Sequence, residues 1–390
     1  MRACVVGGGL AGSLLAWRLA QRLDVHVDLV LGRHQDADAT QASGGAVRAY
    51  EPSAQARRLA IASLRELLGS RVLLQWSDYR QTGFVYLRET DAGLAAEAEE
   101  IDRELPGSVE LLPASPAAGS RSLGWSRFPG RIAVLERQAG YISPAELRRA
   151  ILTDLAGRPG ATVRAAVLDA LEPTGTGDTA RATVDGSVHE YDVIVLAVGA
   201  WTHDLLRANG RRGRGYRTKS IQYTIYAAGA WRPPSFADEI SGLYGRPTAD
   251  GGLLLGVPTA EWDVGPGRTP VTPACHRRAA ELAAGFFAEL QLGQVRSVTS
   301  AADCYCDPPI LRLRGLADAA PCLLTFTGGS GGSVKTVLAA SRLAAAQLVE
   351  SAVPQAEPQA ELLTAPGTDT AAEHVGTALA GSEIVHDDAP

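Results

Sequence analysis

The sequence is poor in several kinds of residue, and each shortage excludes a class of protein. Only 5 of its 390 residues are cysteine, which is too few for a disulfide scaffold and favours a reducing cytoplasm. No charge-free apolar run reaches the ~20 residues that a membrane-spanning helix needs. With 37 basic and 43 acidic residues the net charge is −6, which argues against a nucleic acid or an anionic membrane as partner.

Lysine is the scarcest charged residue. It occurs only at Lys219 and Lys335, so the other 35 basic residues are arginine. A GC-rich genome replaces casual surface lysines by arginine, and two survivors are also compatible with chance. The functional interpretation is that these two positions need a compact ammonium where a planar guanidinium does not fit.

The N-terminus predicts a strand, a helix and a second strand rather than a signal peptide, because four glycines interrupt its apolar stretch. The expected elements are a buried strand at Arg2–Val6, a helix at Leu10–Leu23 whose apolar side includes Leu23, and a strand at Val25–Leu31. This order is typical of the start of a parallel α/β sheet.

A Gly7-x-Gly9-x-x-Gly12 fingerprint lies between the first strand and the helix. Its glycines permit a tight turn, a close approach to a pyrophosphate and close packing of helix on strand, so they predict a dinucleotide site. The alternative is a glycine-rich turn without a ligand. The acidic ribose ligand expected after the second strand is missing. Arg33 stands there, either as a partner of a 2′-phosphate or as a solvated loop residue.

The rest of the chain predicts further elements of both kinds. Ser143-Pro144 is typical of a helix start before Glu146–Leu155. Residues 212–304 alternate like an antiparallel sheet. The last forty residues lack the apolar content for a core and are expected to be disordered. The remaining expected elements are strands at Ala161–Leu171, Tyr191–Val198 and 322–327, and a helix at Val334–Glu350.

Five stretches in order resemble the FAD-dependent amino-acid and amine oxidases, the family of glycine oxidase, D-amino-acid oxidase and monomeric sarcosine oxidase. Besides the glycine fingerprint they are Ala42–Tyr50, Gly140–Leu147, Val193–Trp201 and Gly328–Lys335. The resemblance implies an α/β (α+β) fold in which a Rossmann-like FAD domain carries an inserted, mostly antiparallel substrate domain. The FAD domain is expected at 1–80, 140–211 and 305–350, the substrate domain at 81–139 and 212–304, and the tail at 351–390.

The same resemblance implies that the Ser43–Ala46 loop lines the flavin and that the Gly328–Gly332 turn offers backbone N–H groups to it. Consecutive glycines allow such an approach, although both segments could be ordinary surface loops. The expected cofactor-binding residues are Gly7, Gly9, Leu10, Ala11, Gly12, Arg33, Ser43, Gly44, Gly45, Ala46, Val163, Ala197, Gly199, Trp201, Gly329, Ser330, Gly331, Gly332 and Lys335.

Arg48 and Lys335 stand where sarcosine oxidase has the arginine and lysine that hold the substrate carboxylate. The resemblance therefore implies that the two clamp a carboxylate across the flavin ring, as catalytic and substrate-binding residues. The alternatives are an ion pair of Arg48 with Glu51 and a surface position for Lys335. Tyr50 and Tyr305 are further expected substrate contacts, and Tyr223 and Tyr244 are candidate pocket walls.

The chain also departs from the family. No arginine occurs in Asp303–Pro308, where glycine oxidase has one for the carboxylate, so glycine itself fits less well than a substituted amino acid. Cys304 or Cys306 stands near the cysteine that carries covalent flavin in sarcosine oxidase, but non-covalent FAD is the first expectation. Leu254 replaces the oxygen-activating lysine. Lys219 is the candidate catalytic substitute, unless it only reaches to solvent.

The expected function is oxidation of the C–N bond of a secondary amino acid, either N-carboxymethyl or N-methyl, to an imine, with oxygen as acceptor and peroxide as product. The expected setting is bacterial specialised metabolism, in which a glycine oxidase homologue forms a β-amino acid. The alternative is a dehydrogenase with another electron acceptor, which Leu254 favours. A flavin hydroxylase and a non-catalytic flavin protein are weaker alternatives. No metal is expected, because Cys304-x-Cys306 lacks metal-ligand spacing.

Overall fold

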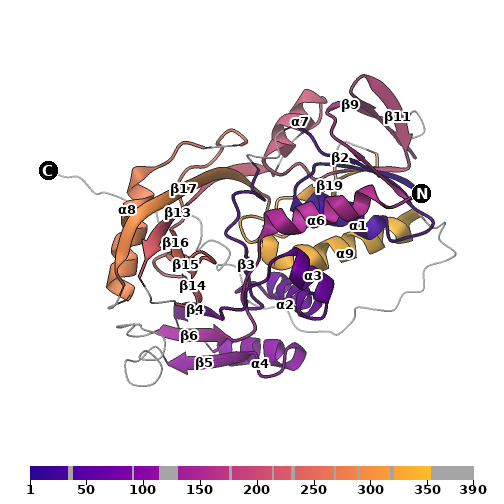
Figure 1. Ribbon diagram of the computed structural model, residues 1–390. Helices are drawn as coiled ribbons and strands as arrows, with labels where there is room; N and C mark the ends of the chain where they lie inside the picture. Colours follow the sequence, from indigo (N-terminus) through magenta and orange to yellow (C-terminus); the bar gives the residue numbers. More distant parts are fainter. Residues whose placement is uncertain are drawn as a thin grey trace.

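The computed structural model describes residues 1–33, 38–89, 92–113, 131–174, 178–212, 215–229, 233–267, 269–287, 290–316 and 320–352. Within these ranges the chain forms mixed α/β structure with four sheets, as predicted (Figure 1). The predicted tail lies outside the described residues except for Ser351 and Ala352, which end the last helix.

A six-stranded sheet has the strand order β18-β19-β12-β1-β2-β8. It contains the glycine fingerprint that predicts a dinucleotide site, and for that prediction we call it the nucleotide-binding part. All its neighbours pair in parallel except β18 and β19. Its central strands are apolar on both faces, which suits a parallel sheet covered on both sides. The bounds are β1 Arg2–Val6, β2 His26–Val30, β8 Ala161–Arg164, β12 Val193–Leu196, β18 Arg312–Gly315 and β19 Leu323–Thr327.

Two sequence predictions were wrong in detail here. Helix α1 (Leu10–Leu19) ends four residues early, and Leu23 lies fully exposed beyond it, while Leu14, Leu15 and Leu19 are fully buried. The expected single strand at 161–171 is two strands, β8 and β9 (Leu168–Pro173), which belong to different sheets. Strand β9 pairs with β10 (Ala180–Val184), and β10 with β11 (Ser187–Tyr191).

Helices α1, α6 (Pro144–Ala156) and α9 (Ser333–Ala352) pack together beside the six-stranded sheet (Figure 1). Helix α9 also packs against α2 (Ala54–Leu68). Ser143 caps α6 as predicted, since its Oγ accepts a hydrogen bond from the Glu146 N–H. The remaining helices are α3 Arg71–Trp76, α4 Leu94–Glu104, α7 Thr202–Ala208, α8 Pro273–Phe286 and the 3₁₀ turn η2 Gly199–Trp201.

An eight-stranded sheet forms the second part, in the order β17-β13-β16-β15-β14-β4-β6-β5. It is antiparallel except between β14 and β4. Helix α8, which the sequence did not predict, covers one face (Figure 1). The bounds are β17 Leu292–Tyr305, β13 Arg217–Ala228, β16 Gly252–Gly256, β15 Tyr244–Pro247, β14 Ser235–Asp238, β4 Phe84–Glu89, β6 Arg131–Glu136 and β5 Val109–Pro113.

The two large sheets meet through short segments from distant parts of the chain. Strand β3 (Ala46–Val47) pairs with β7 (Gly140–Tyr141) between them (Figure 1). At the end of β17, Tyr305 forms a bridge with Gly329 in the turn before α9. The uncovered face of the eight-stranded sheet is therefore turned toward the nucleotide-binding part. Among the described residues no helix is both long and apolar enough to cross a bilayer.

Candidate active site

The N-terminal glycines form a close-packed turn with no room for side chains at two positions. Gly7 has φ +118°, and a Cβ there would lie 2.3 Å from the Ala197 carbonyl oxygen. A Cβ on Gly12 would lie 2.1 Å from the Gly7 carbonyl oxygen. Gly9 instead faces more open space at the start of α1, its nearest neighbour being Thr40 Oγ1 at 3.4 Å. These positions therefore fit a dinucleotide whose pyrophosphate approaches the helix N-terminus.

The segment after β2 supplies an acidic side chain that the sequence fingerprint did not assign. Asp38 Oδ2 lies 2.6 Å from Nη1 of Arg148 and 3.9 Å from an ideal Cβ on Gly9. Thr40 Oγ1 accepts a hydrogen bond from the Leu10 N–H at 2.9 Å. Arg33 points outward instead, with 74% of its side chain exposed and Asp185 at 3.9 Å. Among the described residues of this loop, Asp38 is thus a carboxylate that lies beside the glycine fingerprint.

Four further expected cofactor residues lie along the carboxyl end of the parallel sheet. Val163 is on β8, where it pairs with Leu29 of β2. Ala197 follows β12 directly and contacts both Gly7 and Gly12. Gly199 and Trp201 form η2 immediately after it. Ligands of open α/β sheets bind outside this edge, so the arrangement fits the expected cofactor.

The glycine turn at 328–332 lies against the end of β17. Ser330 adopts φ +64°, an uncommon backbone conformation for a residue with a side chain. Its N–H donates to the Cys304 carbonyl at 3.1 Å. A Cβ on Gly331 would meet Asp303 Oδ2 at 3.2 Å and the Tyr305 hydroxyl at 3.7 Å. The turn therefore presents its backbone next to two polar side chains of the eight-stranded sheet.

Strand alternation places a set of polar side chains on the sheet face opposite α8. Antiparallel partners share a face, and successive residues alternate between faces. The side chains of Tyr226, Phe236 and Leu253 pack with α8. The residues directly before and after each of them in its strand therefore point the opposite way, toward the nucleotide-binding part. The residues on this second face include Lys219, Tyr223, Tyr244, Arg246, Leu254, Asp303 and Tyr305.

Lys219 lies on this face next to Asp303, which approaches the glycine turn. They are register partners on β13 and β17. Lys219 is only 6% exposed, with Nζ 4.8 Å from the centre of the Trp262 ring, and burial lowers its pKa. Burial also raises the pKa of Asp303 to about 6. Tyr305 packs its ring against Trp262 at 5.0 Å. Lys219 is thus a buried side chain and not one that reaches to solvent.

Arg48 and Lys335, from opposite ends of the chain, meet at the carboxylate of Glu51. Arg48 Nη2 lies 2.8 Å and Lys335 Nζ 2.5 Å from the same Glu51 oxygen, Oε1. Arg48 also stacks over the rings of Phe84 and Tyr86 on β4. The Lys335 side chain is only 15% exposed, so it is not a surface lysine. The Arg48–Glu51 ion pair is formed, and Lys335 joins it.

The charges in this cluster depend on one another. Burial disfavours the ionised form of Glu51, but Lys335 and Arg48 outweigh it and lower the Glu51 pKa. Burial, together with repulsion from Arg48, lowers the pKa of Lys335. Nε and Nη1 of Arg48 are buried without a hydrogen-bond partner among the described residues. Two donors of Arg48 are therefore available to a second acceptor, and unpaired buried donors are costly.

Glu136 approaches the same arginine from β6. Its carboxylate accepts the N–H groups of Ala49 at 2.6 Å and Tyr50 at 3.0 Å, and burial raises its pKa. These bonds hold the backbone that carries Arg48. The residue is 1% exposed and fixes the position of the Arg48 segment against the eight-stranded sheet.

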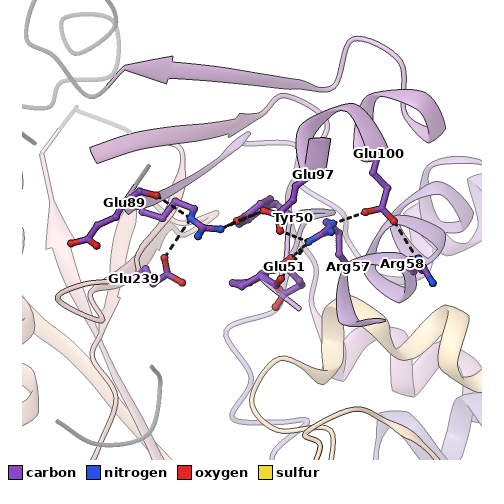
Figure 2. Close-up of polar contacts among 10 residues, drawn as sticks. Tyr50, Glu51, Arg57, Arg58, Glu89, Glu97, Glu100 and Glu239 are labelled. Atoms are coloured by element: carbon purple, nitrogen blue, oxygen red, sulfur yellow. Dashed lines mark hydrogen bonds and ion pairs between the residues drawn. The ribbon is translucent and has the colours of Figure 1, made fainter. Parts of the chain in front are cut away.

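Tyr50 takes part in a separate polar network. It has no exposed surface, and its hydroxyl bonds to Glu97 at 3.0 Å and to Arg88. Figure 2 shows this network continuing through Arg57 to Glu100. An ion pair between Arg88 and Glu239 extends it on the other side. Tyr50 is thus placed among structural contacts between α2, α4 and β4.

The two cysteines near the glycine turn differ in their surroundings. Cys304 is 5% exposed, and burial raises its pKa to about 11. Cys306 is partly exposed, and its Cβ would touch a Cβ on Gly328. A thiol with a raised pKa is a poor nucleophile, so Cys304 is less suited than an ordinary thiol to attack a flavin. Among the described residues no group of three or more potential ligands could hold a metal ion.

The sequence alone did not assign Arg246, Asp38 or Asp303 to the site. Arg246 lies beside Leu254 as its cross-strand partner, and its Nε donates to the Gly44 carbonyl at 2.5 Å. The available signal was the period of two along β15, which puts Arg246 on the same face as Tyr244. The sequence does not say which face of the sheet this is. The packing of α8 on the opposite face shows that Arg246 and Tyr244 point toward the nucleotide-binding part.

Comparison with known proteins gives a family and a fold. Residues 2–347 match the profile of the FAD dependent oxidoreductase family, named DAO. Glycine oxidase from Geobacillus kaustophilus is a similar solved structure, with TM-score 0.71, 18% identity, and 92% of this chain and 97% of that chain covered. Iminodiacetate oxidase from Chelativorans sp. BNC1 is also similar, with TM-score 0.70 and 19% identity, and the alignment covers 92% of this chain and 98% of that chain. No curated protein matched the chain.

NikD, described as an unusual amino acid oxidase essential for nikkomycin biosynthesis, is also similar. Its TM-score is 0.68 at 21% identity, and the alignment covers 91% of this chain and 95% of that chain. Each of these likenesses is below 25% identity and concerns the fold.

Proposed function

Because the chain belongs to the FAD-dependent oxidoreductase family, we propose that it oxidises the C–N bond of a secondary amino acid, an N-substituted glycine or an N-methyl amino acid. The product is an imine that water hydrolyses, with hydrogen peroxide formed when oxygen is the acceptor. When bound, FAD supplies the two-electron acceptor. The similar structures are described as oxidases of glycine, iminodiacetate and an amino acid, which supports this class of substrate.

The observation that carries the proposal is the meeting of Arg48 and Lys335 at one buried carboxylate. Glu51 demonstrates that an anion is stable between them. Nε and Nη1 of Arg48 have no partner among the described residues, and their N–H groups are suited to a carboxylate from the substrate. Charge-assisted hydrogen bonds of this kind are the strongest in proteins, particularly where water is excluded.

The chain's cations also act on the substrate amine. A secondary amine must lose its proton before it can give up a hydride equivalent. Positive groups near the amine disfavour its ammonium form and so lower its pKa. Arg48 and Lys335 supply that effect together with their grip on the carboxylate. No side chain is required to act as a general base.

The test is anaerobic titration of the yellow protein with sarcosine, N-substituted glycines and larger N-methyl amino acids. One of these classes should bleach the flavin absorbance. Lys335→Met should raise the substrate Kd on the order of 10²-fold, because it removes a charged hydrogen-bonding partner. Arg342→Met, which removes an exposed arginine from the same helix, is the control and should bind normally. Unchanged binding in Lys335→Met would contradict the clamp.

A second candidate is a dehydrogenase that passes electrons to an acceptor other than oxygen. It is favoured by Leu254, a fully buried leucine at the position where the related sarcosine oxidase sequence has its oxygen-activating lysine. Measuring peroxide during turnover separates the two. A flavin that substrate reduces normally but that oxygen reoxidises only slowly would favour the dehydrogenase.

A further inference from the structure

Arg246 is a partly buried cation with no carboxylate beside it. Its Nε donates to the Gly44 carbonyl at 2.5 Å, its Nη1 to the Pro247 carbonyl at 3.1 Å, and its guanidinium carbon lies 4.0 Å from the centre of the Tyr141 ring. Among the described residues no acidic oxygen lies within 4.0 Å of it, and Nη2 has no hydrogen-bond partner. Burial lowers its pKa, which means that its environment disfavours the positive charge.

Other buried arginines of the protein, unlike Arg246, form ion pairs with carboxylates. Arg48 is paired with Glu51, Arg57 with Glu97 and Glu100, and Arg148 with Asp38. A charge removed from water costs several kcal/mol unless it is paired. The acidic side chain whose charge acts on Arg246 is Asp250, which is 71% exposed and is paired with Arg296 at 3.0 Å. Carbonyl groups and one ring offset part of the cost, and an anionic ligand would offset the rest.

Arg246 faces the same side of the sheet as the Arg48 cluster. Arg48 stacks on Phe84 and Tyr86 of β4, and Arg246 is on β15. Only β14 separates these strands, so β15 and the β4 strand over which Arg48 stacks are about 10 Å apart at the level of the backbone. On this face β14 carries the small residues Ser235 and Ala237. Two positive centres therefore flank a strip of sheet without a bulky side chain.

We propose that Arg246 binds a second carboxylate of the substrate, so that the preferred substrate is an N-carboxymethyl amino acid with two carboxylates. The inference rests on the proposed function and specifies its substrate class. One carboxylate takes the free donors of Arg48 together with Lys335, and the other takes Nη2 of Arg246. The secondary amine lies between the two centres. An N-methyl amino acid has one carboxylate and leaves one centre unpaired.

Binding is tested without oxidation by titrating the holoenzyme with oxydiacetate and ethoxyacetate and following the flavin absorbance. The two molecules have an ether oxygen in place of the amine and differ in one carboxylate. The wild type should bind oxydiacetate on the order of 10²-fold more tightly, which is about 2.7 kcal/mol. Arg246→Met should lose this preference but bind ethoxyacetate as before. Arg246→Lys should keep part of it.

Arg296→Met removes an exposed arginine from the same sheet and should behave as wild type. The inference is overturned if the wild type binds both ethers equally, or if Arg246→Met retains the preference. If Arg246→Met does not hold flavin, Arg246→Lys is the deciding variant. It lacks the second amino group of the guanidinium, so a preference for oxydiacetate equal to that of wild type would also overturn the inference.

A reduction experiment separates this inference from the proposed function. N-(2-carboxyethyl)glycine and N-propylglycine are nearly isosteric and differ in the second carboxylate. Tight, selective binding of oxydiacetate without flavin reduction by either amine would sink the proposed oxidation but leave the dicarboxylate site. Equal reduction by both amines would support the oxidation and overturn the role of Arg246.

Discussion

At the scale of single residues, burial changes the ionisation of several side chains in the candidate site, and Asp303 shows the consequence for stability. Its carboxyl is buried beside the glycine turn, and the one hydrogen bond that it accepts from the described part of the chain comes from the Cys304 N–H at 3.0 Å. Burial raises its pKa from 3.8 to about 6. The folded protein therefore holds this proton more tightly than the unfolded chain. The resulting contribution to stability is complete below about pH 4 and is lost as the pH rises through 6.

Asp303→Asn removes the stability loss that accompanies ionisation of this carboxyl, because an amide does not ionise. The free energy of unfolding of the variant should rise relative to wild type between pH 4 and pH 7, by about 1–3 kcal/mol, as urea titrations at several pH values would measure. Asp263→Asn is the control, because Asp263 is exposed and Arg217 holds its pKa below the usual value. Parallel pH profiles for wild type and Asp303→Asn would show that this carboxyl is ionised at low cost.

At the scale of the element, two helices begin after a serine, and only one of the two serines bonds to the helix backbone. Ser143 and Ser53 both stand at helix N-caps, before α6 and α2. Only Ser143 makes the side-chain bond, to the Glu146 N–H, while Ser53 makes none. A serine before a helix is thus a signal of position, but its energetic value depends on whether the hydroxyl reaches the backbone.

Ser143→Ala should therefore lower the free energy of unfolding by ~1 kcal/mol, because one N–H of the first turn loses its acceptor. Ser53→Ala, with no such bond to lose, should change it by only a few tenths of a kcal/mol. Denaturant unfolding of both variants against wild type measures the difference. Equal losses would mean that the Ser143 bond contributes nothing of its own.

At the scale of the whole molecule, the candidate active site lies where two parts of the chain meet. The eight-stranded sheet offers Lys219, Asp303 and Arg246, and the nucleotide-binding part offers the Gly44 loop and the glycine turn. We propose that Lys219 has an electrostatic role in flavin reoxidation, because its ammonium group is buried on the face that carries Asp303 and Arg246. Lys219 is buried on the correct face, whereas Arg217, two residues earlier, is exposed.

Lys219→Met should slow reoxidation of the reduced flavin by oxygen at least about tenfold, since a fixed positive charge stabilises the developing negative charge. Reduction by substrate should change little. Stopped-flow mixing of the reduced protein with oxygenated buffer measures the first rate. Arg217→Met, which removes an exposed cation near the same Trp262 ring, should reoxidise as wild type. Unaltered oxygen kinetics in Lys219→Met would remove this role.

Some features of the protein follow from the sequence because their causes are local. The glycine fingerprint predicts a tight strand-to-helix turn, since Gly7 and Gly12 occupy positions where a Cβ would meet backbone atoms. Ser143-Pro144 predicts the start of α6 for a similar reason. The family and its FAD requirement were predictable in a different way, from the resemblance of five ordered stretches to known oxidases, and the family match over residues 2–347 confirms both.

Other features depend on what packs against what. Leu23 continues the apolar spacing of α1, but the helix has already ended at Leu19 and the leucine is exposed. The spacing of Arg246 from Tyr244 shows a shared face without saying which one, and only α8 on the opposite side decides it. Likewise, Arg48 and Lys335 are 287 positions apart, and it is the folded chain that brings both to Glu51. Periodicity and turn chemistry act within a few residues, whereas charge pairing and burial are properties of neighbours in space.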